Sequence, residues 1–386
     1  MRDESFFTQI EGYTEVKQDI LSSRKYGIDM SRQSFLASEL INRLHPKKLV
    51  LKVSQVIDEM DSVRTIRLVR DKGHLPPFEA GQYINLSVNI DGVVTSRPYS
   101  MSSAPSQTAY YDITVKRTDG GFVSNYLLDC LRVGEVLSST APAGEFHYNP
   151  LFHGDDLVML AGGSGVTPMM SMIRQFASFG SNKNIHLIYI CRTPEEVIFH
   201  KELERIEREF DKFRYTVVIS RPKENYEGIT GHITSELLAS LLQNITDKTY
   251  YICGPTGMCD AAKNDLLSLG VRPGKIRQEN FGESADVTTK PGWPESVKTG
   301  STVRVKVVGS TTFDAPVGEP LLNSLDRAGV SVPSSCHSGE CSLCRVKLLQ
   351  GTVFHLADSK ERVSDKKYGY IHSCSSYPTG DIEIEI

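Results

Sequence analysis

The spacing of apolar and polar residues changes along the 386-residue chain, and each change predicts a different kind of structure. From about residue 48 to 150, short runs such as 49–57 and 82–90 alternate between apolar and polar positions, with Gly, Pro, Asp or Asn between them. A period of two is typical of half-buried strands, and many such runs predict an antiparallel β-barrel. A single predicted helix, at 124–131, interrupts this pattern.

From about residue 155 to 280, continuous apolar runs alternate with amphipathic segments of helical length. A buried strand followed by an amphipathic helix, several times over, is the pattern of a parallel sheet with helices on both faces. This part of the chain therefore predicts a doubly wound α/β domain with five strands, at 157–163, 185–191, 215–220, 249–254 and 275–281.

The C-terminal part predicts a linker and a small α+β domain. Residues 286–300 combine Pro, Gly, Ser, Thr and charge, which is typical of an interdomain linker. The runs 302–309 and 311–316 then predict a hairpin, and 320–329 predicts a helix.

The N-terminal extension predicts a helix that needs a partner. Its apolar stripe ends before Pro46 and comprises Phe35, Leu36, Leu40, Ile41 and Leu44. The stripe could pack on the barrel, or it could mediate self-association or a partner contact. The expected division of the chain is 1–46, 47–153, 154–285, 286–300 and 301–386.

Composition excludes some classes of protein. With 43 basic and 47 acidic residues the net charge is −4, so we expect no broad attraction to nucleic acid or to anionic membranes. The polar N-terminus lacks the core of a signal peptide, and no apolar run approaches the ~18 residues of a membrane span. We therefore expect a cytoplasmic protein. Of its eight cysteines, Cys130, Cys191 and Cys259 are isolated among apolar neighbours and are expected in the core.

Four other cysteines have the spacing of a metal centre. Cys336, Cys341 and Cys344 form C-x4-C-x2-C, and Cys374 follows at a distance. This is the spacing of plant-type [2Fe–2S] ligation, whereas a four-cysteine zinc site usually shows two C-x2-C pairs. The C-terminal segment resembles a plant-type ferredoxin, which implies a β-grasp fold.

Two motifs in the barrel segment fit a flavin. Residues 97–100, RPYS, offer an Arg for a phosphate, a Tyr ring for an isoalloxazine face and a Ser hydroxyl for the flavin edge. Gly120, Gly121 and Ser124 then precede the predicted helix, where exposed N–H groups make an anion site.

The α/β segment carries two loops that fit a dinucleotide. Gly162, Gly163 and Gly165 follow the first strand directly, and Thr167 and Pro168 open the next helix. Residues 253–258, CGPTGM, end the fourth strand. Both loops are expected at the carboxyl edge of the sheet, where such folds bind ligands.

In this order, the two flavin motifs resemble those of the ferredoxin–NADP reductase superfamily. The resemblance implies that Arg97 and Ser124 hold a flavin pyrophosphate, Tyr99 packs on the ring and Ser100 lies near its reactive nitrogen. It implies FAD, with FMN less favoured. It also implies that Cys253 orients the nicotinamide and that Glu279 and Phe281 approach the flavin. The implied cofactor-binding set is Tyr83, Arg97, Pro98, Tyr99, Ser100, Val115, Lys116, Gly121, Val123, Ser124, Gly163, Gly165, Thr167, Pro168, Ser220, Arg221, Cys253, Gly254, Pro255 and Met258.

Ser220 and Arg221 end the third strand, where a hydroxyl and an Arg could bind the 2′-phosphate of NADPH. This favours NADPH slightly and leaves NADH open.

Over residues ~48–386 the chain looks like the reductases with a C-terminal ferredoxin domain that serve oxygenases, hydroxylases and the hybrid cluster protein. The expected function is electron transfer from NAD(P)H through FAD and a [2Fe–2S] cluster to an acceptor protein. One alternative is a reductase with a small-molecule acceptor. Another is a redox-sensing iron–sulfur module without turnover.

Overall fold

The computed structural model describes residues 48–280, 287–298, 300–334, 342–356 and 361–386. It also describes Thr14, Lys17, Gln18, Ile20, Leu21, Pro46, His337 and Gly339. The chain forms two compact units, 1–46 and 47–386. The stripe from Phe35 to Leu44 lies outside the described residues, so its predicted helix stays a prediction.

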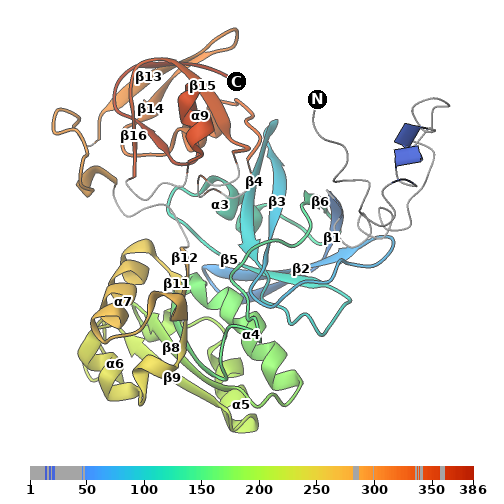
Figure 1. The fold of residues 1–386 in the computed structure, drawn as a ribbon, viewed down its shortest axis with the longest axis vertical. Helices are drawn as coiled ribbons and strands as arrows, with labels where there is room; N and C mark the ends of the chain where they lie inside the picture. Colours follow the sequence, from blue (N-terminus) through green and yellow to red (C-terminus); the bar gives the residue numbers. More distant parts are fainter. Residues whose placement is uncertain are drawn as a thin grey trace. The chain divides into compact units, whose positions relative to one another are not determined.

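The first part of the larger unit is a curled antiparallel sheet (Figure 1). Its strand order is β4-β3-β6-β1-β2-β5, and an antiparallel bridge between Met101 and Ile113 joins the chain after β4 to β5. Buried and exposed residues alternate at the start of β1, as the period of two predicts. The elements are β1 (Leu49–Met60), β2 (Val63–Arg70), β3 (Tyr83–Ile90), β4 (Val93–Ser100), β5 (Tyr111–Lys116), α3 (Phe122–Asp129) and β6 (Val136–Ser139).

The expectation that Cys130 lies in the core is wrong, because its side chain is exposed. Helix α3 ends at Asp129 and Cys130 is its C-cap, where the chain leaves the buried face formed by Val123, Leu127 and Leu128. Cys191 and Cys259 are buried, as expected.

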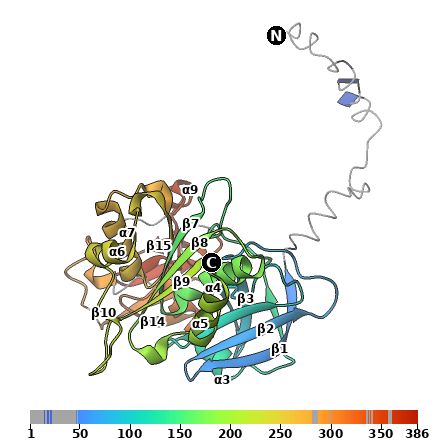
Figure 2. The same ribbon diagram turned by 90° about the horizontal axis from the view of Figure 1, so that it is seen from below.

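The second part is a parallel sheet of order β10-β9-β8-β7-β11-β12, whose neighbouring strands β9, β8 and β7 are visible in Figure 2. All five predicted strands are present, and the two-residue β10 is an addition that is too short to leave a sequence pattern. The strands are β7 (Asp156–Gly162), β8 (Asn184–Cys191), β9 (Phe213–Ile219), β10 (Ile229–Thr230), β11 (Thr249–Gly254) and β12 (Ile276–Asn280).

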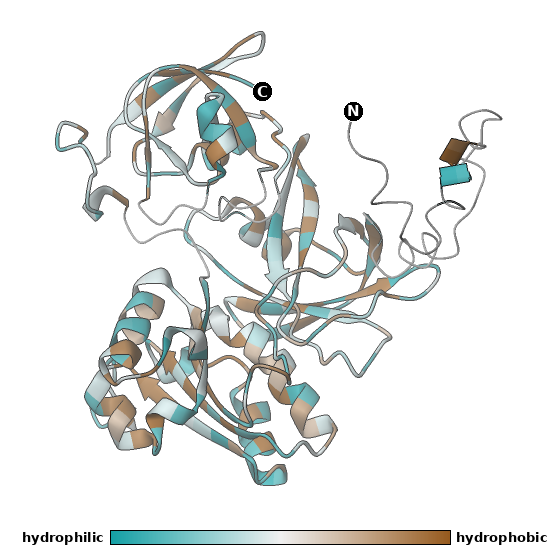
Figure 3. Ribbon diagram, in the orientation of Figure 1, coloured by the Kyte–Doolittle hydropathy of each residue, from teal (hydrophilic) through white to brown (hydrophobic). Residues whose placement is uncertain are grey.

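Helices cover both faces of this sheet, which Figure 3 shows as mostly hydrophobic strands between helices of mixed character. The buried residues of α4 (Val166–Ser178) and α5 (His200–Glu209) share one core with Met159 and Ala161. Those of α6 (Ser235–Leu241) and α7 (Thr256–Ser268) share the opposite core with Val158 and Leu160. Chain order reverses direction between β7 and β11, so their carboxyl ends form the switch point at which doubly wound folds bind ligands.

The third part is a five-stranded mixed sheet of order β14-β13-β19-β15-β17 with a two-stranded β16–β18 ribbon. The predicted hairpin is β13 (Thr302–Val307) and β14 (Thr312–Pro316), and the predicted helix is α8 (Leu321–Arg327). The remaining elements are β15 (Arg345–Gln350), β16 (Val353–His355), α9 (Val363–Lys367), β17 (Tyr370–His372), β18 (Ser376–Pro378) and β19 (Ile382–Glu385).

The described part of the predicted linker is packed rather than free. Val287 is buried, and Trp293 packs partly buried against the core of the C-terminal domain. The Trp293 ring meets the Phe354 ring edge-on, with 5.2 Å between centroids. Apolar residues inside a Pro- and Gly-rich composition explain this difference, because they gain free energy by leaving water.

Candidate functional site

Strand β4 carries three of the predicted flavin contacts in a fixed register on β3. Tyr83 lies opposite Ser100, and Leu86 lies opposite Arg97. The Tyr83 ring lies so close to Gly144 that a Cβ there would be 3.0 Å from two ring carbons. Tyr99 is half-buried, and burial raises the pKa of its hydroxyl. Two tyrosine rings and the Ser100 hydroxyl are therefore held on neighbouring strands.

The start of α3 is shaped as an anion site. Gly120 has a φ of +68°, and Gly121 is an N-cap without any side-chain cap, so first-turn N–H groups remain available. A Cβ on Gly121 would lie 2.2 Å from the Ser124 Oγ and 3.1 Å from the Thr118 carbonyl oxygen, so a larger residue there would displace Ser124. Val115 and Val123 are buried in the barrel core instead, and their side chains serve packing.

Arg97, the predicted phosphate partner, lies between β4 and α8. Its Nη1 donates to the Thr95 Oγ1 and to the Ser96 carbonyl, both at 2.9 Å. Its Nη2 lies 3.2 Å from the Asp326 Oδ2 and 3.3 Å from the Asn323 Oδ1. The sequence did not predict that a carboxylate of the C-terminal domain would share this guanidinium.

These contacts belong to a polar seam between β4 and the C-terminal domain. The Thr95 Oγ1 donates to the Asp326 Oδ2 at 2.8 Å, and both residues are buried. The Ser96 Oγ donates to the Ser334 carbonyl at 2.8 Å, two residues before Cys336. Burial raises the pKa of Asp326, while Arg97 and Thr95 oppose that rise. One strand thus connects the cysteine segment to Tyr99 and Ser100.

The two glycine loops of the α/β domain pack backbone to backbone at the switch point. A Cβ on Gly165 would lie 2.2 Å from the Cys253 carbonyl oxygen, and one on Gly162 would lie 2.5 Å from the Met258 sulfur. A Cβ on Gly254 would lie 3.0 Å from the Gly162 Cα. The predicted meeting of these loops is confirmed. Glycine is therefore required at these positions for the two loops, with the Met258 side chain beside them, to pack this closely.

Thr167 and Pro168 lie in the first turn of helix α4, after the Gly162–Gly165 loop, rather than in that loop. Both are buried in α4, and the Thr167 hydroxyl donates to the Ser164 carbonyl at 2.7 Å. Thr167 therefore holds the loop in shape. Pro255 is the N-cap of α7, which presents the second loop at a helix start.

Ser100, Cys253 and Glu279 come together where the end of β4 meets the α/β domain. Cys253 is fully buried and lies opposite Glu279 in the parallel pairing of β11 with β12. Burial raises the pKa of the Cys253 thiol, and the nearby Glu279 raises it further. A thiol kept neutral in this way is unsuited to nucleophilic attack.

The Glu279 carboxyl group is strongly perturbed. Burial raises its pKa to about 8, and a hydrogen bond with Ser100 acts in the opposite direction. Its Oε2 is buried and has no hydrogen-bond partner among the described residues. Ser100, Cys253, Glu279 and Phe281 are the residues that the resemblance implies at the reacting groups, and Phe281 lies outside the described residues.

Lys116 reaches from the barrel to the α/β domain. Its Nζ donates to the Glu196 Oε2 at 2.9 Å and lies 3.8 Å from the position of a Cβ on Gly163. Both members of the ion pair are half-buried. The cofactor-binding set that the resemblance implies contained Lys116, but its acidic partner could not be found without the fold.

Ser220 and Arg221 follow β9 at the same edge. The Ser220 N–H donates to the Cys191 carbonyl and the Arg221 N–H to the Arg192 carbonyl, at 2.9 and 2.8 Å. Arg221 and Arg192 are both exposed. Sequence reasoning missed Arg192, although its place directly after a buried strand was a usable signal.

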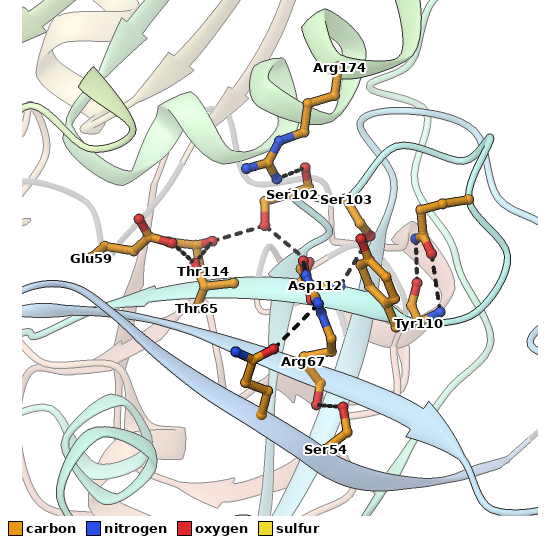
Figure 4. Close-up of polar contacts among 12 residues, drawn as sticks. Ser54, Glu59, Thr65, Arg67, Ser102, Ser103, Tyr110, Asp112, Thr114 and Arg174 are labelled. Atoms are coloured by element: carbon orange, nitrogen blue, oxygen red, sulfur yellow. Dashed lines mark hydrogen bonds and ion pairs between the residues drawn. The ribbon is translucent and has the colours of Figure 1, made fainter. Parts of the chain in front are cut away.

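Figure 4 shows a polar contact that fixes α4 against the barrel. The Arg174 Nη1 donates to the Ser102 carbonyl at 2.7 Å, and the Ser171 hydroxyl donates to the Ser103 carbonyl at the same distance. The Ser102 and Thr114 hydroxyls are 2.9 Å apart. Barrel residues, among them Phe146, share one buried cluster with the α/β domain. These contacts therefore fix strand β4 and the two glycine loops relative to each other.

The described part of the cysteine segment fits a buried cluster. Cys344 and Cys374 are buried in the core of the C-terminal domain, and Cys336 and Cys341 lie outside the described residues. The Ser373 N–H and hydroxyl both donate to the Cys344 carbonyl, at 3.0 and 2.8 Å, which draws the two cysteine segments together. Gly339 has a φ of +78°, as in a tightly curled loop.

His372 links the cysteine loop to helix α9. Its Nδ1 lies 2.6 Å from the Gly339 carbonyl oxygen, and its Nε2 lies 2.8 Å from the Asp365 Oδ2. Burial alone would lower the pKa of His372, but these two acceptors outweigh it and raise the pKa. Because both ring nitrogens face acceptors, the site favours the protonated form of His372.

The chain's residues fit the three cofactor groups. An uncapped helix start beside Gly121 suits a flavin phosphate, and the touching glycine loops suit a dinucleotide. The buried thiols of Cys344 and Cys374, on two segments joined through Ser373, suit a [2Fe–2S] cluster. Among the described residues, no helix combines the length and the apolar character needed to cross a membrane.

Three family models match the chain in sequence order. They are the oxidoreductase FAD-binding domain at residues 50–148, the oxidoreductase NAD-binding domain at 159–264 and the 2Fe-2S iron-sulfur cluster binding domain at 305–379. The order is the one that the motifs predict.

Similar proteins extend over nearly the whole chain. The glycine betaine monooxygenase reductase subunit of Chromohalobacter salexigens is 33% identical, over 86% of this chain and 93% of its own. NADH oxidoreductase HCR of Escherichia coli is 30% identical, over 86% and 96%. The solved structure of phthalate dioxygenase reductase has a TM-score of 0.63 and 25% identity, over 88% and 98%.

Proposed function

Because the chain belongs to the ferredoxin–NADP reductase superfamily, in the branch with a C-terminal [2Fe–2S] ferredoxin domain, we propose that its acceptor is an oxygenase component. The chain is an NAD(P)H oxidoreductase that passes electrons through FAD and the cluster to an acceptor protein. Relatives named as reductase subunits of a glycine betaine monooxygenase and of a stachydrine N-demethylase support an oxygenase as that acceptor.

When bound, FAD accepts a hydride from NAD(P)H and gives electrons singly, and the [2Fe–2S] cluster carries one electron at a time. The protein's contribution is to bind and orient these groups. Arg97, the N–H groups beside Gly121 and the Ser124 hydroxyl bind the flavin phosphate, and Tyr99 packs on the ring. The uncapped start of α3 supports this assignment.

On the nucleotide side, the loops at 162–165 and 253–258 take the dinucleotide on bare backbone. Cys253 orients the nicotinamide as a neutral, buried thiol, because its raised pKa disfavours the thiolate. Glu279 holds a proton near neutral pH, and its carboxyl group positions Ser100 beside the flavin edge. For Phe281, which lies outside the described residues, the family resemblance implies an approach to the flavin. Lys116 links the barrel to the α/β domain through its ion pair with Glu196.

On the output side, Cys336, Cys341, Cys344 and Cys374 ligate the cluster. The polar seam that joins Thr95 and Ser96 to Asp326 and Ser334 keeps this segment beside the flavin strand. The domain boundaries at 47–153, 154–285 and 301–386 assign one of the three tasks to each domain.

The observation that carries this proposal is the position of β4. Its first residues contact the ferredoxin segment, and its last residue, Ser100, meets Glu279 at the nucleotide switch point. A single strand thus spans the route from hydride donor to cluster.

The test is a Cys341→Ser variant. We expect loss of the cluster's visible absorption and of cytochrome c reduction, with FAD content and NAD(P)H–ferricyanide activity retained. Retention of the reduced-cluster EPR signal would contradict ligation by Cys341. An oxygenase component purified from the same source should then be reduced by the wild type and not by the variant.

We also propose a modest preference for NADPH. Ser220 and Arg221 support it, and Arg192 adds a second exposed cation at the same edge. Steady-state KM values for NADPH and NADH measure this preference directly.

A further inference from the structure

One surface of the ferredoxin domain exposes both positive charge and two large apolar side chains. It is formed by α9 and the adjoining start of β15, and we call it the α9 face. Val363 is 82% exposed and Tyr368 is 67% exposed. The cations around them are all exposed and comprise Arg345, Arg362, Lys366 and Lys367.

The carboxylates of the same segments point inward. Glu361 and Asp365 are the only acidic residues in 342–350 and 361–372, and both are buried. Asp365 contacts His372 at 2.8 Å and Arg345 at 3.7 Å, and Glu361 contacts His355 at 2.8 Å and Lys366 at 3.4 Å. Arg362 and Lys367 make no ion pair among the described residues. Solvent therefore meets a locally positive surface on a chain whose net charge is −4.

This face borders the cysteine loop. Arg345 follows the ligand Cys344 directly, and the preceding residue, Leu343, is 52% exposed. From α9, Asp365 binds His372, and His372 binds the Gly339 carbonyl inside the loop. A protein on the α9 face would thus lie beside the segment that holds the cluster.

The contact of the ferredoxin domain with the barrel leaves this face uncovered. That contact uses α8 and residues 331–334, through the polar seam and through the Ser331 hydroxyl on the Val94 carbonyl. The exposed side chains of α9 make no hydrogen bond or ion pair with the barrel among the described residues.

We propose that the α9 face docks an acidic surface of the acceptor protein. The proposal rests on the proposed function and adds the site and charge of the partner. Val363 and Tyr368 add exposed apolar surface that an interface would remove from water. The surrounding cations speed encounter with an acidic partner and reject a basic one. Because the exposed charge of the α9 face is positive, an acidic protein surface is the complementary occupant.

The test uses two haem proteins of opposite charge as probes, acidic cytochrome b5 and basic cytochrome c. The variant Arg362→Glu/Lys367→Glu reverses two charges of the face in the full-length holoprotein. At about 20 mM ionic strength it should slow cytochrome b5 reduction and speed cytochrome c reduction, each by about tenfold. Both effects should shrink towards zero at about 0.5 M salt, where charges are screened within ~4 Å.

The matched control is Lys298→Glu/Arg304→Glu, which makes the same change of net charge at exposed positions on and before β13. Strand β13 is separated from β17 by two strands in the sheet. The control should shift each probe's rate by less than about twofold. Ferricyanide reduction and the cluster EPR signal should match the wild type in both variants.

Three results would overturn the proposal. If the variant and the control behave alike, the α9 face does not dock the acceptor, although the proposed function stands. If the wild type reduces neither haem protein while it reduces ferricyanide, the proposed function fails together with the docking site. If light scattering shows that the wild type is a dimer and the variant a monomer, the face binds a second copy of this chain instead.

Discussion

Replacing Glu279 by Gln should remove a pH dependence from the stability of the protein. Burial raises the pKa of this carboxyl group from 4.5 to about 8 in the folded protein. Between these two values the folded state holds a proton that the unfolded state has released. Stability therefore falls as pH rises from about 4.5 to about 8, and this contribution stays constant at higher pH.

The magnitude follows from the size of the shift. Each pKa unit corresponds to about 1.4 kcal/mol, so the full shift sets a ceiling of about 5 kcal/mol. Because the residue is only partly buried and hydrogen-bonds with Ser100, we expect about 2 to 4 kcal/mol. Gln resembles the protonated acid and does not ionise. The stability of Glu279→Gln should therefore match that of the wild type near pH 5 and exceed it above pH 8.

The assay is thermal unfolding of holoprotein at pH 5, 7 and 8.5. At roughly 2 to 4 °C per kcal/mol, Glu279→Gln should raise Tm by about 4 to 16 °C at pH 8.5. The control is Glu224→Gln, at an exposed position of the same domain. A Tm difference between Glu279→Gln and wild type that is equal at pH 5 and pH 8.5 would refute the reasoning.

Three further substitutions test other parts of the site. Asp326→Ala removes the buried acceptor of Thr95 and should slow flavin-to-cluster electron transfer in stopped-flow traces, with a loss of about 1 to 3 kcal/mol in stability. Gly165→Ala places a Cβ 2.2 Å from the Cys253 carbonyl oxygen and should raise KM for both nucleotides at least about tenfold. Arg221→Ala should raise KM for NADPH more than for NADH, by a factor that corresponds to about 1.5 to 3 kcal/mol.

Matched variants separate these effects from general damage. Asp314→Ala removes an exposed carboxylate from the same domain as Asp326 and should leave electron transfer unchanged. Gly274→Ala, in the same domain but outside both loops, adds a Cβ that meets nothing within 4 Å and should leave both KM values unchanged. Equal KM changes for NADPH and NADH in Arg221→Ala would count against a 2′-phosphate contact.

The sequence was sufficient for features that depend on local pattern. Period-two runs, the βα alternation and the C-x4-C-x2-C spacing each reflect residues that are close in sequence. The meeting of the Gly162–Gly165 loop with the 253–258 loop was also predictable, because parallel strands bring their carboxyl ends to one edge.

Features that depend on contact between distant segments were not predictable. Nothing in the RPYS motif indicates that Arg97 also binds Asp326, which is 229 positions further along the chain. Lys116 and Glu196 meet only once the barrel and the α/β domain are assembled. Cys130 lies among apolar neighbours in sequence, but it is exposed because α3 ends one residue earlier.

The most direct test of the central claim is anaerobic mixing of the holoprotein with one equivalent of NADH or NADPH, followed by stopped-flow absorbance and freeze-quench EPR. Flavin absorbance should bleach first. The EPR signal of the reduced [2Fe–2S] cluster should then rise to about one electron per cluster. In Cys341→Ser the first phase should remain and the second should vanish. A cluster signal that rises before or without flavin reduction would contradict the path from nucleotide through flavin to cluster.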